Sequence, residues 1–84
     1  MREFLTGTEY EALATSTTVQ FQNVGNGTLI VTRATTQPAA DTPGWKYAPG
    51  TGERGAVADL FPAQTGTLWG RSEESTFVLV EESS

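Results

Sequence analysis

The chain has 84 residues, a net charge of −5 at pH 7, and neither cysteine nor histidine. A chain of this length forms one domain, and this one lacks the residues for disulfides, zinc sites, Ser-His-Asp catalysis and Cys-His catalysis. Its five Lys and Arg residues are too few to neutralise a run of phosphates, so we expect no nucleic-acid partner. It contains no apolar run that could span a bilayer, so we expect a protein made in the cytoplasm without a membrane partner.

Large hydrophobic residues are scarce in this sequence. Val, Leu, Ile and Phe together make up about a fifth of the chain, close to the level at which a chain of high net charge fails to fold. In so small a domain the gain from apolar burial and the entropy cost of ordering nearly cancel. Because no disulfide or metal can brace the fold, we expect a homo-oligomer, with a trimer as the first expectation, or docking on a larger partner.

The first segment, residues 1–16, lacks the pattern of the rest and is predicted to be an N-terminal arm or a short helix. Thr8 could cap a helical turn whose early positions carry acids, as the helix dipole prefers. Phe4, Leu5, Tyr10 and Leu13 are hydrophobic residues outside the main pattern, and we hypothesise that they bind a partner protein. The alternative is that they fold back onto their own domain.

From Thr17 onward the apolar residues recur at every second position, which is typical of β-strands. Val19, Phe21 and Asn23 share one predicted face, and a second strand begins at Leu29. The residues Gly25-Asn26-Gly27 between them suit a tight turn, so residues 17–34 are predicted to form a hairpin. Residues 35–44 contain two prolines and are predicted to form a surface loop.

Further strands are predicted at "WKYA" from Trp45, at residues 55–61, at "TGTLWGRS" and at "STFVLVEE". The last of these is apolar on both sides, so it should lie in the middle of a sheet or under another subunit. The segments add up to an all-β domain over residues 17–82, a small antiparallel β-sandwich or barrel of about six strands.

No residue pattern in the chain predicts an enzyme, a cofactor or a metal site. Asp41, Glu53 and Asp59 fall at loops or strand ends, where a pair of carboxylates could act in glycoside cleavage, but solvated turn residues explain them better. Calcium is the one metal with suitable oxygen ligands, between residues 41 and 53, and the spaced acids of a calcium loop are missing. We therefore expect no catalytic residues.

Three aromatic residues allow two interpretations. Trp45, Tyr47 and Trp69 could form a platform on which a sugar ring stacks, which would make the chain a carbohydrate-binding module. In a chain with so few large apolar residues, the rings are better explained as parts of a core or a subunit interface, turned inward.

The order of short motifs resembles small structural proteins encoded among the head and tail genes of tailed bacteriophages. The matching positions are Gln22 and Asn23, the "PAAD" loop at residues 38–41, Pro49 and Gly50, and the "WGR" run at residues 69–71. The resemblance covers residues 17 to 81 and is less clear over residues 50–64.

The resemblance implies a virion component, synthesised in the host cytoplasm, that binds other virion proteins such as the major capsid protein. A capsid decoration or head-associated subunit is the first expectation. A tail or adsorption-apparatus subunit and a small carbohydrate-binding module are the alternatives.

Overall fold

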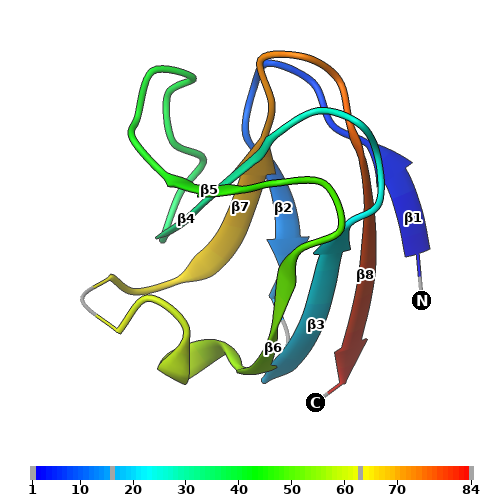
Figure 1. The fold of residues 1–84 in the computed structure, drawn as a ribbon. Coiled ribbons are helices and arrows are strands. Elements are labelled where there is room, and N and C mark those ends of the chain that lie inside the picture. Colours follow the sequence, from blue (N-terminus) through cyan, green and yellow to red (C-terminus); the bar gives the residue numbers. More distant parts are fainter. Residues whose placement is uncertain (1, 16, 63, 84) are drawn as a thin grey trace.

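A computed structural model describes residues 2–15, 17–62 and 64–83, which form two four-stranded antiparallel sheets packed face to face (Figure 1). The predicted all-β sandwich is therefore confirmed. Sheet A has the order β1-β8-β3-β6, with strands Arg2–Leu5, Phe77–Ser83, Thr18–Asn23 and Gly52–Ala56. Sheet B has the order β2-β7-β4-β5, with strands Glu11–Ala14, Thr67–Arg71, Leu29–Ala34 and Trp45–Tyr47. No helix long and apolar enough to cross a bilayer occurs among these residues.

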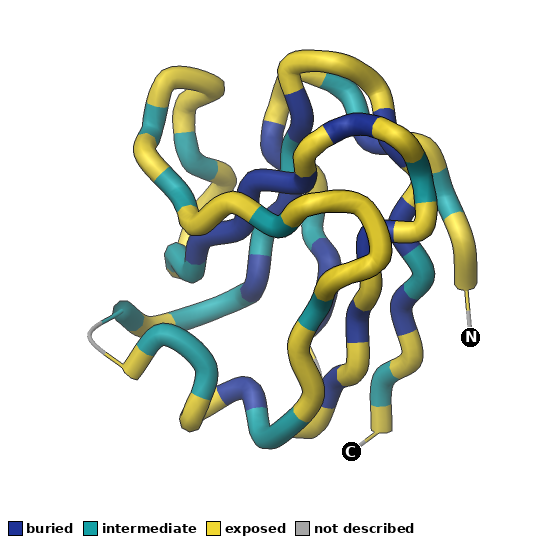
Figure 2. Tube along the Cα trace, in the orientation of Figure 1, coloured by how far each residue is buried: buried dark blue, intermediate teal, exposed yellow. Residues whose placement is uncertain are grey.

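The core lies between the two sheets and is built from alternate residues of the strands, as the tube in Figure 2 shows. In β3 the predicted face of Val19, Phe21 and Asn23 is buried, and the residues between them are exposed. The last strand, β8, is paired on both sides, with β1 and β3, as its two apolar faces predicted. The buried hydrophobic cluster consists of Leu13, Ala14, Val19, Phe21, Leu29, Val31, Val57, Leu68, Val78 and Val80.

Residues 2–15 do not form a separate arm or a helix, and Met1 and Ser16 of the predicted segment lie outside the described residues. Residues 2–5 form β1, which pairs with β8, and residues 11–14 form β2, which pairs with β7. Tyr10 and Leu13 are fully buried, so the alternative in which this segment folds back onto its own domain is the one observed. The sequence pattern missed both strands because each has only four residues and β2 contains a bulge, which breaks the alternation.

The predicted hairpin over residues 17–34 is wrong in its pairing, although both strands exist. Strand β3 belongs to sheet A and β4 to sheet B, so the connection through Gly25 crosses from one sheet to the other. Among the described residues, neither Gly25 nor Gly27 has the positive φ that the predicted tight turn would use. Gly25 is needed for a different reason, because a Cβ there would overlap the Thr76 hydroxyl and the backbone nitrogen of Phe77.

The strand predicted over residues 55–61 is also corrected. Strand β6 ends at Ala56, and a short 3-10 helix follows at Val57–Asp59. Phe61 then takes a φ of 53°, a left-handed conformation that bulky side chains rarely adopt and that lies outside the β region. Arg33 holds this loop, since its side chain donates hydrogen bonds to the carbonyl oxygens of Leu60, at 3.1 Å, and Gly66, at 3.2 Å.

A buried polar network stabilises the connection between β3 in sheet A and β4 in sheet B. The Asn23 amide nitrogen donates to the carbonyl oxygens of Gly27 and Tyr47, at 2.7 and 2.9 Å. Its side-chain oxygen accepts from the Thr76 hydroxyl at 2.7 Å and from the Gly25 N–H at 3.2 Å. Asn23 is fully buried, and it is acceptable there because these four hydrogen bonds occupy its polar atoms.

Candidate functional site

The acidic residues considered for catalysis or calcium do not assemble. Asp41 lies in the loop between β4 and β5, Glu53 on β6 and Asp59 in the 3-10 helix. Among the described residues there is no group of three or more Asp or Glu side chains that could hold a metal ion. The geometry therefore gives no support to a calcium site formed by these acids.

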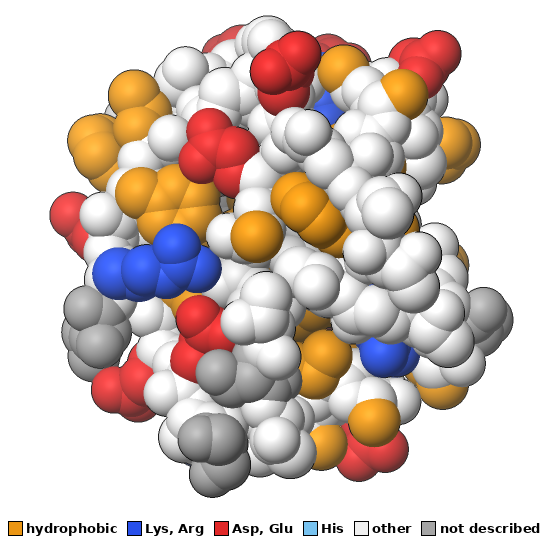
Figure 3. Space-filling model, turned by 180° about the vertical axis from the view of Figure 1, so that it is seen from behind, with side chains coloured by type: hydrophobic (Ala, Val, Ile, Leu, Met, Phe, Trp, Pro, Cys, Tyr) orange, Lys and Arg blue, Asp and Glu red, His pale blue; other side chains and the backbone are white. Residues whose placement is uncertain are grey.

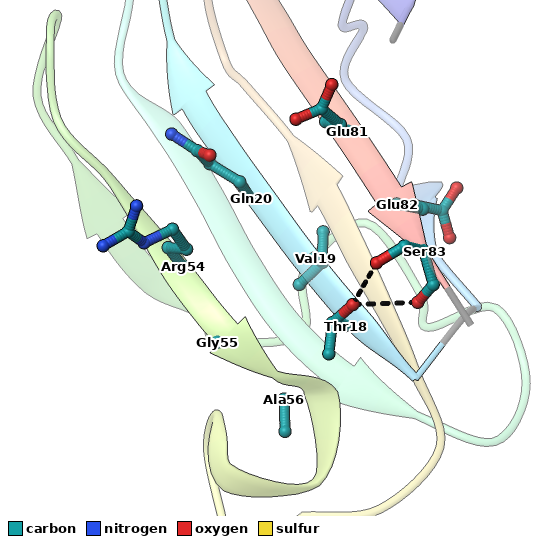
Figure 4. A pocket seen from close by; sticks show the side chains of 9 residues that line it. All are labelled: Thr18, Val19, Gln20, Arg54, Gly55, Ala56, Glu81, Glu82 and Ser83. Atoms are coloured by element: carbon teal, nitrogen blue, oxygen red, sulfur yellow. Dashed lines mark hydrogen bonds between the residues drawn. The ribbon is translucent and has the colours of Figure 1, made fainter.

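A shallow depression of about 550 Å³ lies on the outer face of sheet A, across β6, β3 and β8 (Figure 4). Arg54, Gln20 and Glu81 lie in a row across these strands, and Figure 4 shows the two charged side chains on opposite sides of Gln20 without meeting. At one end the Thr18 hydroxyl donates to the Ser83 carbonyl oxygen at 2.9 Å. The lining carries two hydroxyls, at Thr18 and Ser83, and two carboxylates, at Glu81 and Glu82, and the described residues hold no group of three or more side chains that could bind a metal ion.

A second depression, of about 580 Å³, lies on the outer side of sheet B next to the loop of residues 40–44. Lys46 and Arg71 flank Ile30 as its partners on the neighbouring strands, and Asp41 and Glu73 complete the wall. The depression holds charges of both signs, so it favours neither an anion nor a cation.

Tyr10 helps to hold the loop beside this depression. Its hydroxyl donates to the Thr42 carbonyl oxygen at 2.7 Å, and the Arg71 guanidinium lies 5.9 Å from the centre of its ring. Burial raises the pKa of Tyr10, and the positive charge of Arg71 opposes that shift. Tyr10 and Leu13 are therefore structural residues of the core, closed to any partner.

The three aromatic residues of the possible sugar platform do not share one face. Trp45 pairs with Val31 of β4, so its side chain lies on the inner side of sheet B. Trp69 pairs with the next residue of β4, so its side chain lies on the outer side. Tyr47 packs inward with its ring edge against Phe21, and the two ring centres are 5.3 Å apart. The sequence predicts rings turned inward, which fits Tyr47, whereas Trp69 faces outward and donates from its indole N–H to the Ala34 carbonyl oxygen at 3.0 Å.

Trp45 lies on the inner side of its strand but at the rim, and its side chain remains 62% exposed. Its ring stacks on Phe61, with the planes 5° from parallel and the ring centres 6.2 Å apart. Only one face of the Trp45 ring is covered in this way. The rim of the sandwich therefore presents one open aromatic ring, not a platform of three.

The remaining exposed large hydrophobics gather on the outer face of sheet A. Leu5 and Phe77 are direct partners on β1 and β8, and they are 51% and 47% exposed. Val24, which is 41% exposed, donates its backbone N–H to the Phe77 carbonyl oxygen at 2.9 Å. Leu79 lies two positions after Phe77 on the same face. We call these four residues, Leu5, Val24, Phe77 and Leu79, the apolar patch.

The apolar patch contains one of the predicted partner-binding residues, Leu5, while Phe4 faces inward and packs against the core under the Arg2 guanidinium. Sequence reasoning missed Val24 and Phe77. The alternation placed Phe77 and Leu79 correctly on one face of the last strand, but the pattern could not show that this face stays open.

Comparison with protein-family models, with curated proteins and with solved structures found no match to this chain.

Proposed function

We propose that this chain is a structural protein of a tailed-bacteriophage virion, a capsid decoration or head-associated subunit that binds other virion proteins such as the major capsid protein. The observation that carries the proposal is the apolar patch. A monomer rarely leaves neighbouring large hydrophobics open to water unless another molecule covers them. The short motifs, including Gln22 and Asn23, resemble those of phage structural proteins, so the partner we propose is another virion protein.

The scaffold suits such a role. Both sheets are held by strand pairs that are distant in the sequence, and the polar network around Asn23 fixes the connections at one end. A sheet face on a rigid sandwich can present a binding surface with little entropy lost on binding. Binding is the activity that the exposed hydrophobic side chains support.

Self-association is part of the proposal, with a trimer as the first expectation. The buried cluster is small, and the open Trp45 ring and the apolar patch are surfaces that contact with further copies would cover. Covering them would add apolar burial to a domain that has little of it.

The N-terminal residues were expected to form an arm that binds a partner, whereas they form strands β1 and β2 of the sandwich. Deleting residues 2–13 would remove β1 and β2 and with them the fold, so deletion cannot test partner binding. Leu5 and Phe77 are the residues to change, because both side chains are about half exposed and point away from the core.

The test is localisation on virions produced from the genome that encodes the chain. Gold-labelled antibody against the purified protein should decorate the head surface in electron micrographs. Label confined to the tail would instead favour the tail or adsorption-apparatus subunit, and unlabelled particles would contradict a virion role.

A second measurement connects that role to the surface. Particles that lack the protein should bind added wild-type chain, and the double variant Leu5→Glu with Phe77→Glu should bind at least about tenfold more weakly. Ala39→Glu, on an exposed loop far from the patch in sequence, adds a charge without touching it and serves as the matched control. A glycan array should give no specific hits, and strong binding to one sugar would support the carbohydrate-binding alternative.

A further inference from the structure

We infer that Asn26 is a site of spontaneous deamidation that the fold keeps closed, so that it is modified only when the connection between β3 and β4 opens. The site is the Asn26–Gly27 peptide, in the segment that the sequence predicts as a tight turn. The inference goes beyond the proposed function and is independent of it, because it rests on contacts within a single chain.

Deamidation is an attack of the main chain on a labile asparagine side chain. The backbone nitrogen of the following residue bonds to the side-chain carbonyl carbon and gives up its proton to water, while the side-chain nitrogen leaves as ammonia. Water then opens the resulting cyclic imide on one side or the other, which yields aspartate or isoaspartate. The reaction therefore needs an accessible side-chain amide and a backbone nitrogen that is free to move and to lose its proton.

The residue that follows each asparagine distinguishes the two asparagines of the chain. Asn26 is followed by glycine, which has no Cβ to crowd the attacking nitrogen and which lets the backbone turn freely. Asn23 is followed by Val24, whose branched and stiff side chain crowds the nitrogen that would have to attack. Asn26 is therefore the reactive asparagine of the unfolded chain, and Asn23 serves as an internal control.

The side chain of Asn26 is open to the reaction in the folded protein as well. Asn26 is exposed, in the bend between β3 and β4. Within residues 2–15, 17–62 and 64–83 its amide has no hydrogen-bond partner that would hold it away from the main chain. Water, which must open the imide, also reaches this side chain. The fold does not protect the group that is attacked.

The attacking nitrogen, in contrast, is held. Gly27 is buried, and its N–H donates a hydrogen bond to the Thr76 hydroxyl at 3.2 Å. Its carbonyl oxygen accepts a hydrogen bond from the Asn23 side-chain nitrogen at 2.7 Å. The first bond retains the proton that the attack must release, and together the two bonds fix the orientation of Gly27.

The packing around Gly27 leaves no room for ring closure. A Cβ at Gly27 would lie 2.7 Å from the Glu74 carbonyl oxygen and 3.2 Å from the Cβ of Thr76. Thr76 is itself closed to solvent, and its carbonyl oxygen accepts a hydrogen bond from the Thr6 hydroxyl at 2.9 Å. Ring closure has to swing the Gly27 nitrogen toward the preceding side chain, which breaks these contacts. The connection must therefore open before Asn26 can react.

The modification should prevent the connection from closing again. Isoaspartate routes the main chain through the former side chain and so lengthens it, which moves Gly27 away from Thr76 and Asn23. Val24 lies in the same connection and donates its backbone N–H to the Phe77 carbonyl oxygen at 2.9 Å. Modification at Asn26 should therefore also disturb this end of the apolar patch.

The modification also adds a negative charge to an acidic chain. The net charge is already −5, and acidic side chains outnumber basic ones on the face that Figure 3 shows. Further charge of the same sign increases the self-repulsion of the compact state. We expect the modified protein to melt at a lower temperature than the unmodified protein and to separate from it by ion exchange.

The first test compares the folded and unfolded states of the full chain. The protein is incubated at neutral pH with and without guanidinium chloride, and peptide mapping by mass spectrometry follows Asn26 and Asn23 over time. We expect Asn26 to react at least about tenfold more slowly in the folded chain, because the reaction there waits for local opening. Asn23 should react slowly in both states.

A matched pair of variants tests the Thr76 hydroxyl. Thr76→Val keeps the branched shape but removes the acceptor of the Gly27 N–H, whereas Thr76→Ser retains a hydroxyl. We expect Thr76→Val to speed the modification of Asn26 by about tenfold and Thr76→Ser to stay near the wild-type rate. Circular dichroism checks that both variants are folded. If Thr76→Val does not fold, amide hydrogen exchange of Gly27 in the wild type replaces it, and its protection should equal the slowing of deamidation.

Three results would overturn the inference. The first is wild-type Asn26 reacting as fast in the folded chain as in guanidinium chloride. The second is a folded Thr76→Val variant that is modified as slowly as Thr76→Ser, or a Gly27 amide that exchanges without protection. The third is an unfolded chain in which Asn26 reacts no faster than Asn23.

Discussion

The hydroxyl of Thr76 donates a hydrogen bond to the side-chain oxygen of Asn23 across 2.7 Å, and both residues are closed to solvent. Thr76 precedes β8 and Asn23 ends β3, so this bond joins residues 53 positions apart. Thr76 also accepts a hydrogen bond from the Gly27 N–H at 3.2 Å, and its carbonyl oxygen accepts one from the Thr6 hydroxyl at 2.9 Å. The network thus links the connections at one end of the sandwich.

Replacing Asn23 by Leu should destabilise the fold by about 3 kcal/mol. The substitution keeps the branched shape of the side chain but leaves the carbonyl oxygens of Gly27 and Tyr47 and the hydroxyl of Thr76 without their partner, and unpaired buried polar groups are costly. Urea unfolding followed by circular dichroism measures the change. Gln22→Leu is the control, because Gln22 is exposed and its side-chain amide donates to the Gly50 carbonyl oxygen at 3.0 Å, outside the network. Equal losses in the two variants would contradict the role of the network.

Gly25→Ala should destabilise the protein by about 2 kcal/mol or more, because the added methyl group would overlap Thr76 and the backbone of Phe77 and force the connection to move. Gly7→Ala is the matched control, since nothing lies within 4 Å of a Cβ at Gly7. Its free energy of unfolding should stay within about 0.5 kcal/mol of wild type. If both alanine variants melt alike, close packing at Gly25 is not the reason for glycine there.

Tyr47 predicts how stability depends on pH at the alkaline end. Burial, and to a lesser degree the carboxylate of Glu53, raises the pKa of Tyr47 to about 12. In the unfolded chain the phenol loses its proton near its ordinary pKa of about 10, so above that pH the unfolded chain binds fewer protons than the folded one. The contribution of the neutral Tyr47 phenol to the free energy of unfolding is complete below about pH 10 and is lost as the pH rises toward 12.

Urea unfolding at increasing pH measures this loss. Tyr47→Phe removes the titrating group, so its stability should fall less steeply above about pH 10 than that of the wild type. Tyrosinate absorbance of the folded wild type should show both phenols ionising above the usual range, and Tyr47→Phe should remove the ionisation near pH 12. Parallel stability curves for the two proteins would contradict the predicted linkage.

Arg33→Met should loosen the loop after β6 without unfolding the domain. Methionine keeps much of the length of the side chain but removes its hydrogen bonds to the carbonyl oxygens of Leu60 and Gly66. Losing them should make local opening about tenfold more frequent, which corresponds to about 1.4 kcal/mol. Thermolysin cleavage near Leu60, followed by mass spectrometry, measures the opening rate. Arg54→Met, which removes an arginine that bonds nothing in the described chain, should be cleaved at the wild-type rate.

Several strands were predictable because alternation is a local property of the sequence. The pattern of Val19, Phe21 and Asn23 predicted which side of β3 is buried, and the two apolar faces of "FVLV" predicted that β8 is an interior strand. The absence of cysteine and histidine likewise excludes disulfides and histidine-based catalysis through composition alone. These inferences needed only neighbouring residues or residue counts.

What the sequence determined by itself is the all-β class and the inward face of β3, because side chains alternate across a strand whatever it pairs with. Only the tertiary structure decided that the strands on either side of Gly25 belong to different sheets, that Tyr10 and Leu13 lie in the core, and that Trp45 and Phe77 remain open. Pairing and exposure depend on segments far apart in the chain. A local pattern marks a face as apolar, but only the fold shows whether another segment covers it.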